Sequence, residues 1–133
     1  MERARRVLVV EDSDAMRHIA CDVLEMEGFE VLEAVSGFDA LKLLAAEQVD
    51  VVVTDINMPD LTGLELIKFC RSDPKRKDIP VIVISTDSSA ADRERAIKLG
   101  ANDYLVKPFE PDDLVAACRR RIDATTETRG GDE

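Results

Sequence analysis

The 133-residue chain lacks several features that mark particular classes of protein. Its 18 lysine and arginine residues are outnumbered by 28 aspartate and glutamate residues, and the net charge of −10 would repel a phosphate backbone. No apolar run approaches transmembrane length. Only four apolar residues separate the N-terminal arginines from Glu11, too few for a signal peptide. We therefore expect a cytoplasmic protein with no direct nucleic-acid binding and no membrane insertion.

Cysteine and histidine are also scarce. The three cysteines, Cys21, Cys70 and Cys118, form no CxxC motif and fall within helical patterns, which favours reduced residues of the core. The only histidine, His18, lies inside the first predicted helix. We interpret it as a partly exposed helical residue rather than a metal ligand or a phosphate carrier.

What the chain does contain is a regular alternation of apolar strands and helical segments. In the first helix, apolar residues at 15, 19, 23 and 26 follow the helical period. Near-continuous apolar strands predict a parallel sheet covered on both faces, and right-handed crossovers make it a doubly wound α/β sheet. The predicted strands are 7–10, 29–34, 49–54, 81–84 and 103–106, and the predicted helices are 14–27, 36–47, 64–71, 89–99 and 111–122.

The end of the chain differs in composition. After Ile122 the segment is polar and ends in glycines, so we expect one domain over residues 1–123 and a disordered polar tail over residues 124–133. No internal repeat or linker is visible.

The functional signal lies in the residues that end the strands. One apolar run stops at Asp55 before an Asn57-Met58-Pro59 turn, and another stops at Glu11-Asp12. Ligands of open α/β sheets bind beyond the carboxyl ends of the strands. Three carboxylates at that edge would repel each other unless a cation lies among them. The pattern therefore predicts a metal-assisted site.

Two further strands end in Ser85-Thr86 and Lys107. Mg²⁺ prefers hard oxygen ligands, and a carboxylate can attack phosphorus to form an acyl phosphate. The transferring phosphoryl group then needs positive charge and hydrogen-bond donors. The residues that supply this set are Asp55, Glu11, Asp12, Lys107 and Ser85.

Together these motifs resemble the response-regulator receiver domain of two-component signalling, and the chain is similar to stand-alone chemotaxis-type receivers. The resemblance covers residues 7–122. It rests on the Glu11-Asp12 pair, on Asp55 with Met58-Pro59 and Gly63, on the hydroxyl of Ser85, and on Lys107-Pro108-Phe109. It implies a flavodoxin-like sheet of five strands in the order 2-1-3-4-5 with five helices, an order taken from the family.

The resemblance also implies a set of site residues. Asp55 would be the phospho-acceptor. Glu11 and Asp12 would bind Mg²⁺ together with Asp55, with Asp12 the likelier direct ligand of the two. The backbone carbonyl of Asn57 would complete the coordination, and Lys107 would bind the phosphoryl group.

Further residues are implied in switching. Ser85 would be the hydroxyl that moves to meet the phosphoryl group, and Tyr104 the aromatic side chain that rotates with it. Asn57 and Asp87 would tune dephosphorylation. The family pattern also implies a cis peptide bond at Lys107-Pro108.

The implied function is a signalling switch rather than a classical enzyme, with Mg²⁺-dependent phosphotransfer and autodephosphorylation. A histidine kinase would be the phosphodonor. The surface formed by residues 90–99, 103–106 and 112–122 would control a downstream protein target. About ten residues follow the last predicted helix, so output would pass through another protein unless the chain is a fragment of a longer regulator. Phosphorylation-dependent dimerisation stays open.

Several alternatives stay open from the residues themselves. Thr86 rather than Ser85 could be the switch, Tyr104 could be only a strand aromatic, and Lys107 could be a surface lysine. Asp55 and Glu11-Asp12 could cap a turn or a helix. The run of residues 119–121, all arginine, could complement the helix end or bind a partner.

Three rival functions share parts of this pattern. A flavodoxin-type flavin binder needs a hydroxyl- and glycine-rich loop after the first strand, whereas residues 11–14 here include three acids. A haloacid-dehalogenase-type phosphatase has a second aspartate two residues after its nucleophile, where this chain has Asn57. A non-phosphorylated pseudo-receiver that acts only as an interaction module is the third.

Overall fold

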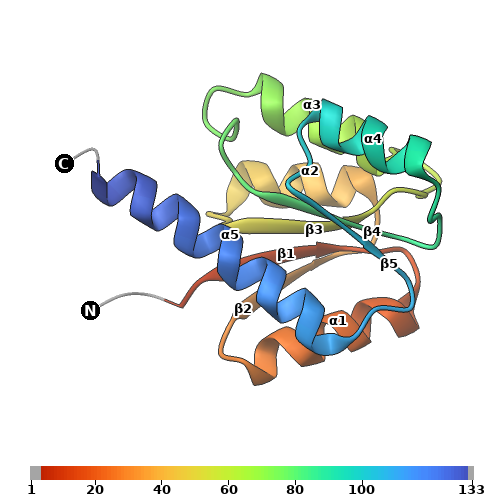
Figure 1. The fold of residues 1–133 in the computed structure, drawn as a ribbon, viewed down its shortest axis with the longest axis horizontal. Coiled ribbons are helices and arrows are strands. Elements are labelled where there is room, and N and C mark those ends of the chain that lie inside the picture. Colours follow the sequence, from red (N-terminus) through yellow and green to blue (C-terminus); the bar gives the residue numbers. More distant parts are fainter. Residues whose placement is uncertain (1–3, 132–133) are drawn as a thin grey trace.

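The computed structural model of the protein describes residues 4–131, which form five strands and five helices in alternation. Neighbouring strands pair in parallel in the order β2-β1-β3-β4-β5 (Figure 1). The predicted doubly wound, flavodoxin-like sheet and its strand order are therefore confirmed. The strands are β1 (Arg6–Val10), β2 (Glu30–Ala34), β3 (Val51–Asp55), β4 (Val81–Ser85) and β5 (Asp103–Val106).

Helices cover both faces of the sheet, and each face has its own apolar core. Successive side chains of a strand point to opposite faces, so Val7 and Val9 of β1 pack with α1 and α5, whereas Leu8 and Val10 pack with α2, α3 and α4. The central strands are mainly apolar because both of their faces are buried. The helices are α1 (Asp14–Met26), α2 (Gly37–Ala46), α3 (Gly63–Ser72), α4 (Ala90–Leu99) and α5 (Pro111–Gly131).

The first helix buries a different face from the one that its apolar pattern indicates. Its buried residues are Arg17, Ala20, Cys21 and Leu24, whereas residues 15, 19 and 26 of the apolar pattern are exposed. The small side chains at 20 and 21 let α1 approach the sheet closely. The buried Arg17 is tolerated because its guanidinium group donates to three acceptors.

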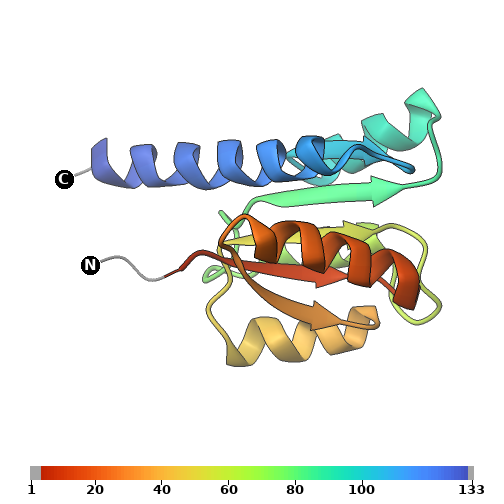
Figure 2. The same ribbon diagram turned by 90° about the horizontal axis from the view of Figure 1, so that it is seen from below.

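The last helix is longer than the sequence indicated. The prediction ended it at Ile122 and left residues 124–133 disordered, but α5 continues to Gly131, and Figure 2 shows its last turns running beyond the sheet. The predicted helix end near Ile122 is therefore too early, because that prediction rested on polar composition. No proline or glycine interrupts the segment before Gly130, so the helical hydrogen bonds can continue. Residues 132–133 lie outside the described residues.

The three cysteines are buried and unbonded, as predicted. Burial disfavours the thiolate and raises the pKa of Cys70 to about 11 and that of Cys118 to about 12. Within residues 4–131, no helix combines the length and the apolar character needed to cross a membrane.

Candidate functional site

The site lies at the carboxyl edge of the sheet, where β1 and β3 deliver acids side by side. These strands are parallel neighbours with Val10 opposite Thr54, so Glu11 follows next to Asp55. Carboxylate oxygens of Glu11, Asp12 and Asp55 lie within 4.8 Å of one another. Glu11 and Asp55 are 1% and 7% exposed, whereas Asp12 is open to solvent. The structure thus brings the three predicted acids together.

Backbone and side-chain hydrogen bonds fix these acids. The Glu11 amide donates to the Ala34 carbonyl of β2 (3.1 Å), and its carboxylate accepts from the Ser13 amide (3.1 Å). Arg17 donates to the Glu11 carbonyl (2.9 Å). The Asn57 amide donates to Asp55 Oδ1 (3.3 Å). Glu11 and Asp55 are therefore held in place by the protein itself, whereas Asp12 is open to solvent.

Lys107 reaches this cluster from the loop after β5. Its Nζ lies 2.5 Å from Glu11 Oε1 and 3.3 Å from Asp55 Oδ2. Burial works to lower the pKa of Lys107, but the contacts with Glu11 and Asp55 outweigh it, so the pKa is raised and the ammonium stays charged. The Lys107-Pro108 peptide bond is cis, which confirms the prediction. Only 10% of the Lys107 side chain is exposed, so it is not a surface lysine.

The predicted switch residues lie beside the acids. Ser85 is fully buried at the end of β4 and its Oγ accepts from the Asp87 amide (3.0 Å), whereas Thr86 is exposed. The Tyr104 ring is buried, and its hydroxyl donates to the Asp87 carbonyl (2.7 Å). These contacts connect Ser85 and Tyr104 through one residue of the β4–α4 loop.

A cavity of about 300 Å³ opens next to these residues, between the β3–α3 and β4–α4 loops. Asn57, Ser85 and Asp87 line it, together with Asp92. Asp87 Oδ1 accepts from the Ser89 amide at the start of α4 (2.8 Å), and hydrogen bonds from Asp92 and Ser89 lower the pKa of Asp87. The predicted dephosphorylation residues therefore share a polar cavity beside the acids.

The donor set fits Mg²⁺. Hard carboxylate oxygens are the ligands that this ion prefers, and it keeps several of its waters, which the exposed side of Asp12 would accommodate. Three carboxylates with a single lysine among them also leave net negative charge at the site. A divalent cation would neutralise it.

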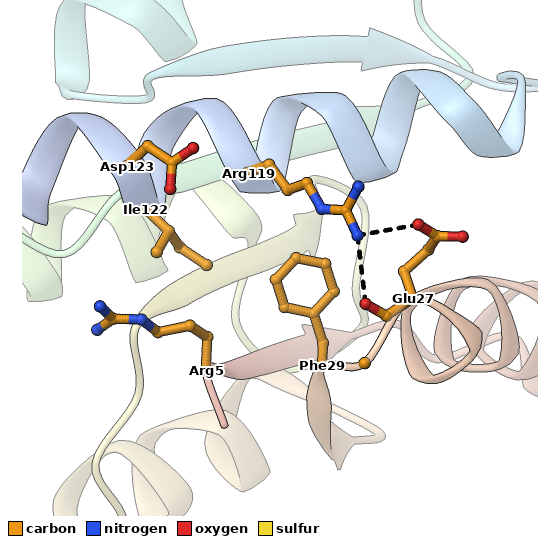
Figure 3. A pocket seen from close by; sticks show the side chains of 7 residues that line it. Arg5, Glu27, Phe29, Arg119, Ile122 and Asp123 are labelled. Carbon is orange, nitrogen blue, oxygen red and sulfur yellow. Dashed lines mark hydrogen bonds and ion pairs between the residues drawn. The ribbon is translucent and has the colours of Figure 1, made fainter. Parts of the chain in front are cut away.

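A larger cavity, of about 480 Å³, lies at the opposite edge of the sheet (Figure 3). Arg5, Phe29 and Arg119 line it, and Arg5 and Phe29 come just before β1 and β2. In Figure 3, Arg119 extends over the Phe29 ring and its guanidinium donates to Glu27 Oε1 (2.9 Å). This cavity is remote from Asp55, and the charge of Arg119 is already paired. The arginine run 119–121 is used in ion pairs with Glu27 and Asp103.

Sequence reasoning missed two residues near the acids. Arg17 is buried and donates to Asp14 (2.6 Å) and Glu33 (3.1 Å) as well as to Glu11. Asp60 accepts from backbone amides at the start of α2. The sequence did offer a signal for the burial of Arg17, which lies between apolar positions of the helix. The role of Asp60 could not be predicted, because it depends on a contact between separate elements.

Comparison with known proteins agrees with this geometry. A sequence model of the response regulator receiver domain matches residues 7–119. The chemotaxis protein CheY1 of Helicobacter pylori is 46% identical over 111 residues, which cover 82% of this chain and 90% of that protein. The chemotaxis response regulator CheY4 of Vibrio cholerae has a similar structure, with a TM-score of 0.84 at 33% identity over 90% of this chain and 99% of that chain.

A third similar structure bears on the metal. The receiver domain of the sensor histidine kinase PA1611 of Pseudomonas aeruginosa PAO1 matches with a TM-score of 0.84 at 26% identity, over 91% of this chain and 99% of that chain. In that structure a magnesium ion is coordinated in the active site cleft.

Proposed function

Because the chain belongs to the response regulator receiver family, of the chemotaxis type, we propose that it is a switch activated by phosphorylation of Asp55. A histidine kinase is the phosphodonor and a separate protein is the target. The observation that carries the proposal is the cluster of Glu11, Asp12 and Asp55 with the Lys107 ammonium inserted between two of its members.

Asp55 is the group that forms the new bond. One of its carboxylate oxygens attacks phosphorus, the bond from phosphorus to the donor's histidine nitrogen breaks, and that nitrogen keeps the electron pair. Glu11, Asp12, Asp55 and the Asn57 carbonyl would hold Mg²⁺, which supplies positive charge for the phosphoryl oxygens when bound. Lys107 supports the same role because its ammonium already lies 3.3 Å from Asp55 Oδ2.

The new phosphoryl group changes the contacts of Ser85 and Tyr104. The Ser85 hydroxyl turns to donate to a phosphoryl oxygen, and its contact with the Asp87 amide is lost. The Asp87 carbonyl also accepts from Tyr104, so a shift of the β4–α4 loop releases the tyrosine hydroxyl. Local charge thereby biases a two-state equilibrium, which is read at the α4-β5-α5 surface. Ile97 and Val106 expose 43% and 38% of their area on it.

Loss of the phosphoryl group returns the switch to its first state. Asn57 and Asp87 line the cavity beside Ser85, where they would orient a water molecule for attack on the acyl phosphate. The protein is therefore a switch with its own phosphotransfer and autodephosphorylation activity. The alternatives are a pseudo-receiver that acts without phosphorylation, a receiver that is part of a longer regulator, and a phosphorylation-dependent dimer.

Beryllofluoride, which mimics a phosphoryl group on aspartate, tests the switch. With Mg²⁺, it should shift the NMR signals of Tyr104 and of the β4–α4 loop in the wild-type protein and leave Asp55→Asn unchanged. Wild-type signals that do not move would exclude the switch and favour the pseudo-receiver.

A further inference from the structure

Asp60 lies in the β3–α3 loop but binds the start of another element. Its Oδ1 accepts from the Gly37 amide (3.1 Å) and its Oδ2 from the Phe38 amide (3.0 Å), the first two residues of α2. Oδ1 also accepts from the Leu61 amide (2.8 Å). Amides at a helix N-terminus carry partial positive charge. These hydrogen bonds lower the pKa of Asp60, and the bond from the Phe38 amide has the largest effect. The carboxylate therefore fastens the loop to α2.

The backbones of the loop and of α2 are also in direct contact at this point. A Cβ atom at Gly37 would lie 2.4 Å from the Leu61 Cβ and 2.8 Å from the Leu61 carbonyl oxygen. Only a glycine at 37 lets α2 approach this closely. The contact and the Asp60 hydrogen bonds thus fix the same part of the loop.

The rest of the loop is anchored at its two ends. The Gly63 amide donates to the Ile56 carbonyl (2.8 Å), and the Thr62 and Glu65 side chains form a capping box at the start of α3. The residues between these anchors, 57–61, include Asn57, whose carbonyl would help to hold Mg²⁺ under the proposed function. Asp60 is the side chain of this stretch that ties it to α2.

We propose that Asp60 is a positioning residue for the metal site: by fastening the β3–α3 loop to α2, it sets the place of the Asn57 carbonyl relative to Asp12 and Asp55. This inference rests on the proposed function, since it presupposes that these residues bind Mg²⁺. Asp60 itself contacts neither the metal nor the phosphoryl group. Its effect on the site is exerted through the loop backbone.

Ser36 provides a matched control. It is the N-cap of the same helix, and its Oγ accepts from the Asp39 amide (3.1 Å). Ser36→Ala weakens the same helix end without removing a bond to the β3–α3 loop. Asp60→Ala weakens the start of α2 and also detaches the β3–α3 loop from it. A difference between the two variants therefore measures the effect of the loop attachment.

The test is Mg²⁺ affinity by isothermal titration calorimetry on the full chain, with wild type, Asp60→Ala, Asp60→Asn and Ser36→Ala. Asp60→Ala should bind about tenfold more weakly, the low end for groups that orient metal ligands. Ser36→Ala should match wild type. Asp60→Asn should lie between, because its amide oxygen still accepts but carries no charge. In metal-free NMR spectra, the Asn57 and Met58 amide signals should move in Asp60→Ala and stay in Ser36→Ala.

The outcomes that overturn the inference are distinct from failure of the proposed function. If wild type binds Mg²⁺ and Asp60→Ala binds it equally well, Asp60 has no positioning role. If Ser36→Ala loses as much affinity as Asp60→Ala, the effect belongs to the stability of α2. If wild type binds no Mg²⁺, the proposed function falls, and this inference falls with it.

Discussion

Lys107 Nζ lies 3.3 Å from Asp55 Oδ2, although 52 residues separate them in the chain, and the same ammonium lies 2.5 Å from the buried Glu11 carboxylate. One side chain therefore balances part of the charge of two acids that the fold brings to one edge. When Mg²⁺ binds, it would share the neutralisation of these acids with the Lys107 ammonium. The contribution of Lys107 to stability should therefore depend on whether Mg²⁺ is bound.

Replacing Lys107 by methionine should destabilise the metal-free protein more than the Mg²⁺-loaded protein. Removing one partner of a buried ion pair costs about 3–5 kcal/mol, because the other charge is left uncompensated. Mg²⁺ can take over that compensation and stabilise the folded state by mass action. Urea unfolding with and without Mg²⁺ measures both values, and the exposed Lys98→Met is the control. Equal losses in the two conditions would mean that Lys107 acts only by packing.

Arg17→Lys should lower the free energy of unfolding by about 2 kcal/mol. A single ammonium cannot reach the Glu11 carbonyl, Asp14 and Glu33 at once, so either the buried Glu11 carbonyl or the ion pairs with the two more exposed acids lose their donor. Arg95→Lys is the control: Arg95 is 63% exposed and pairs with Asp92 at 3.8 Å, so its change should cost less than about 0.5 kcal/mol. Urea unfolding compares the two, and similar costs would refute the role given to Arg17.

Asp87→Ala should lengthen the lifetime of phosphorylated Asp55. Asp87 lines the cavity next to Asn57, so its loss removes a group that could orient the attacking water. Decay of the phosphorylated protein, followed by intact mass after the donor is removed, measures the rate. Because Asp87 also accepts from the Ser89 amide, Ser89→Ala is the control for changes at the start of α4. An unchanged decay rate in Asp87→Ala would remove Asp87 from the mechanism.

Asp103 should contribute stability at neutral pH that is lost in acid. Burial works to raise its pKa, but ion pairs with Arg121 (2.6 Å) and Arg120 (3.2 Å) outweigh it, so the folded pKa lies below the unfolded value of about 3.9. The contribution is complete above that value and disappears as pH falls through the folded pKa. Asp103→Asn should therefore lower the melting temperature at neutral pH.

The difference in melting temperature between wild type and Asp103→Asn should shrink as pH falls below about 4. Circular dichroism over the acidic range measures it. A difference that stays constant with pH would show that the asparagine disturbs packing rather than charge pairing.

The sequence predicted the parts of the site that follow from strand geometry alone. Once parallel strands are recognised, Glu11, Asp55 and Lys107 must lie at the same edge of the sheet. Their contact there also depends on the strand order, which the family resemblance implied. The choice between Ser85 and Thr86 needed the structure, because a shift of the strand register by one residue would turn the other side chain inward. Here β4 ends with Ser85 opposite Val106, which leaves Thr86 exposed.

Contacts between elements could not be predicted in the same way. The bond from Gly37 to Asp60 joins residues 23 positions apart and depends on how closely α2 approaches the loop. The burial of Arg17 contradicts its polarity and is explained only by its three acceptors. For α5, the polar composition after Ile122 suggested that the helix ends there. It continues to Gly131 because no helix-breaking residue occurs before Gly130.

The central claim is that Asp55 itself becomes phosphorylated, and chemical trapping tests it most directly. The protein is incubated with a small phosphodonor and Mg²⁺, then reduced with borohydride, which converts an aspartyl phosphate to homoserine, and its peptides are sequenced by mass spectrometry. The account predicts homoserine at position 55, dependent on Mg²⁺ and absent from Asp55→Asn. Homoserine at another acid, or none in a protein that binds Mg²⁺, would contradict it.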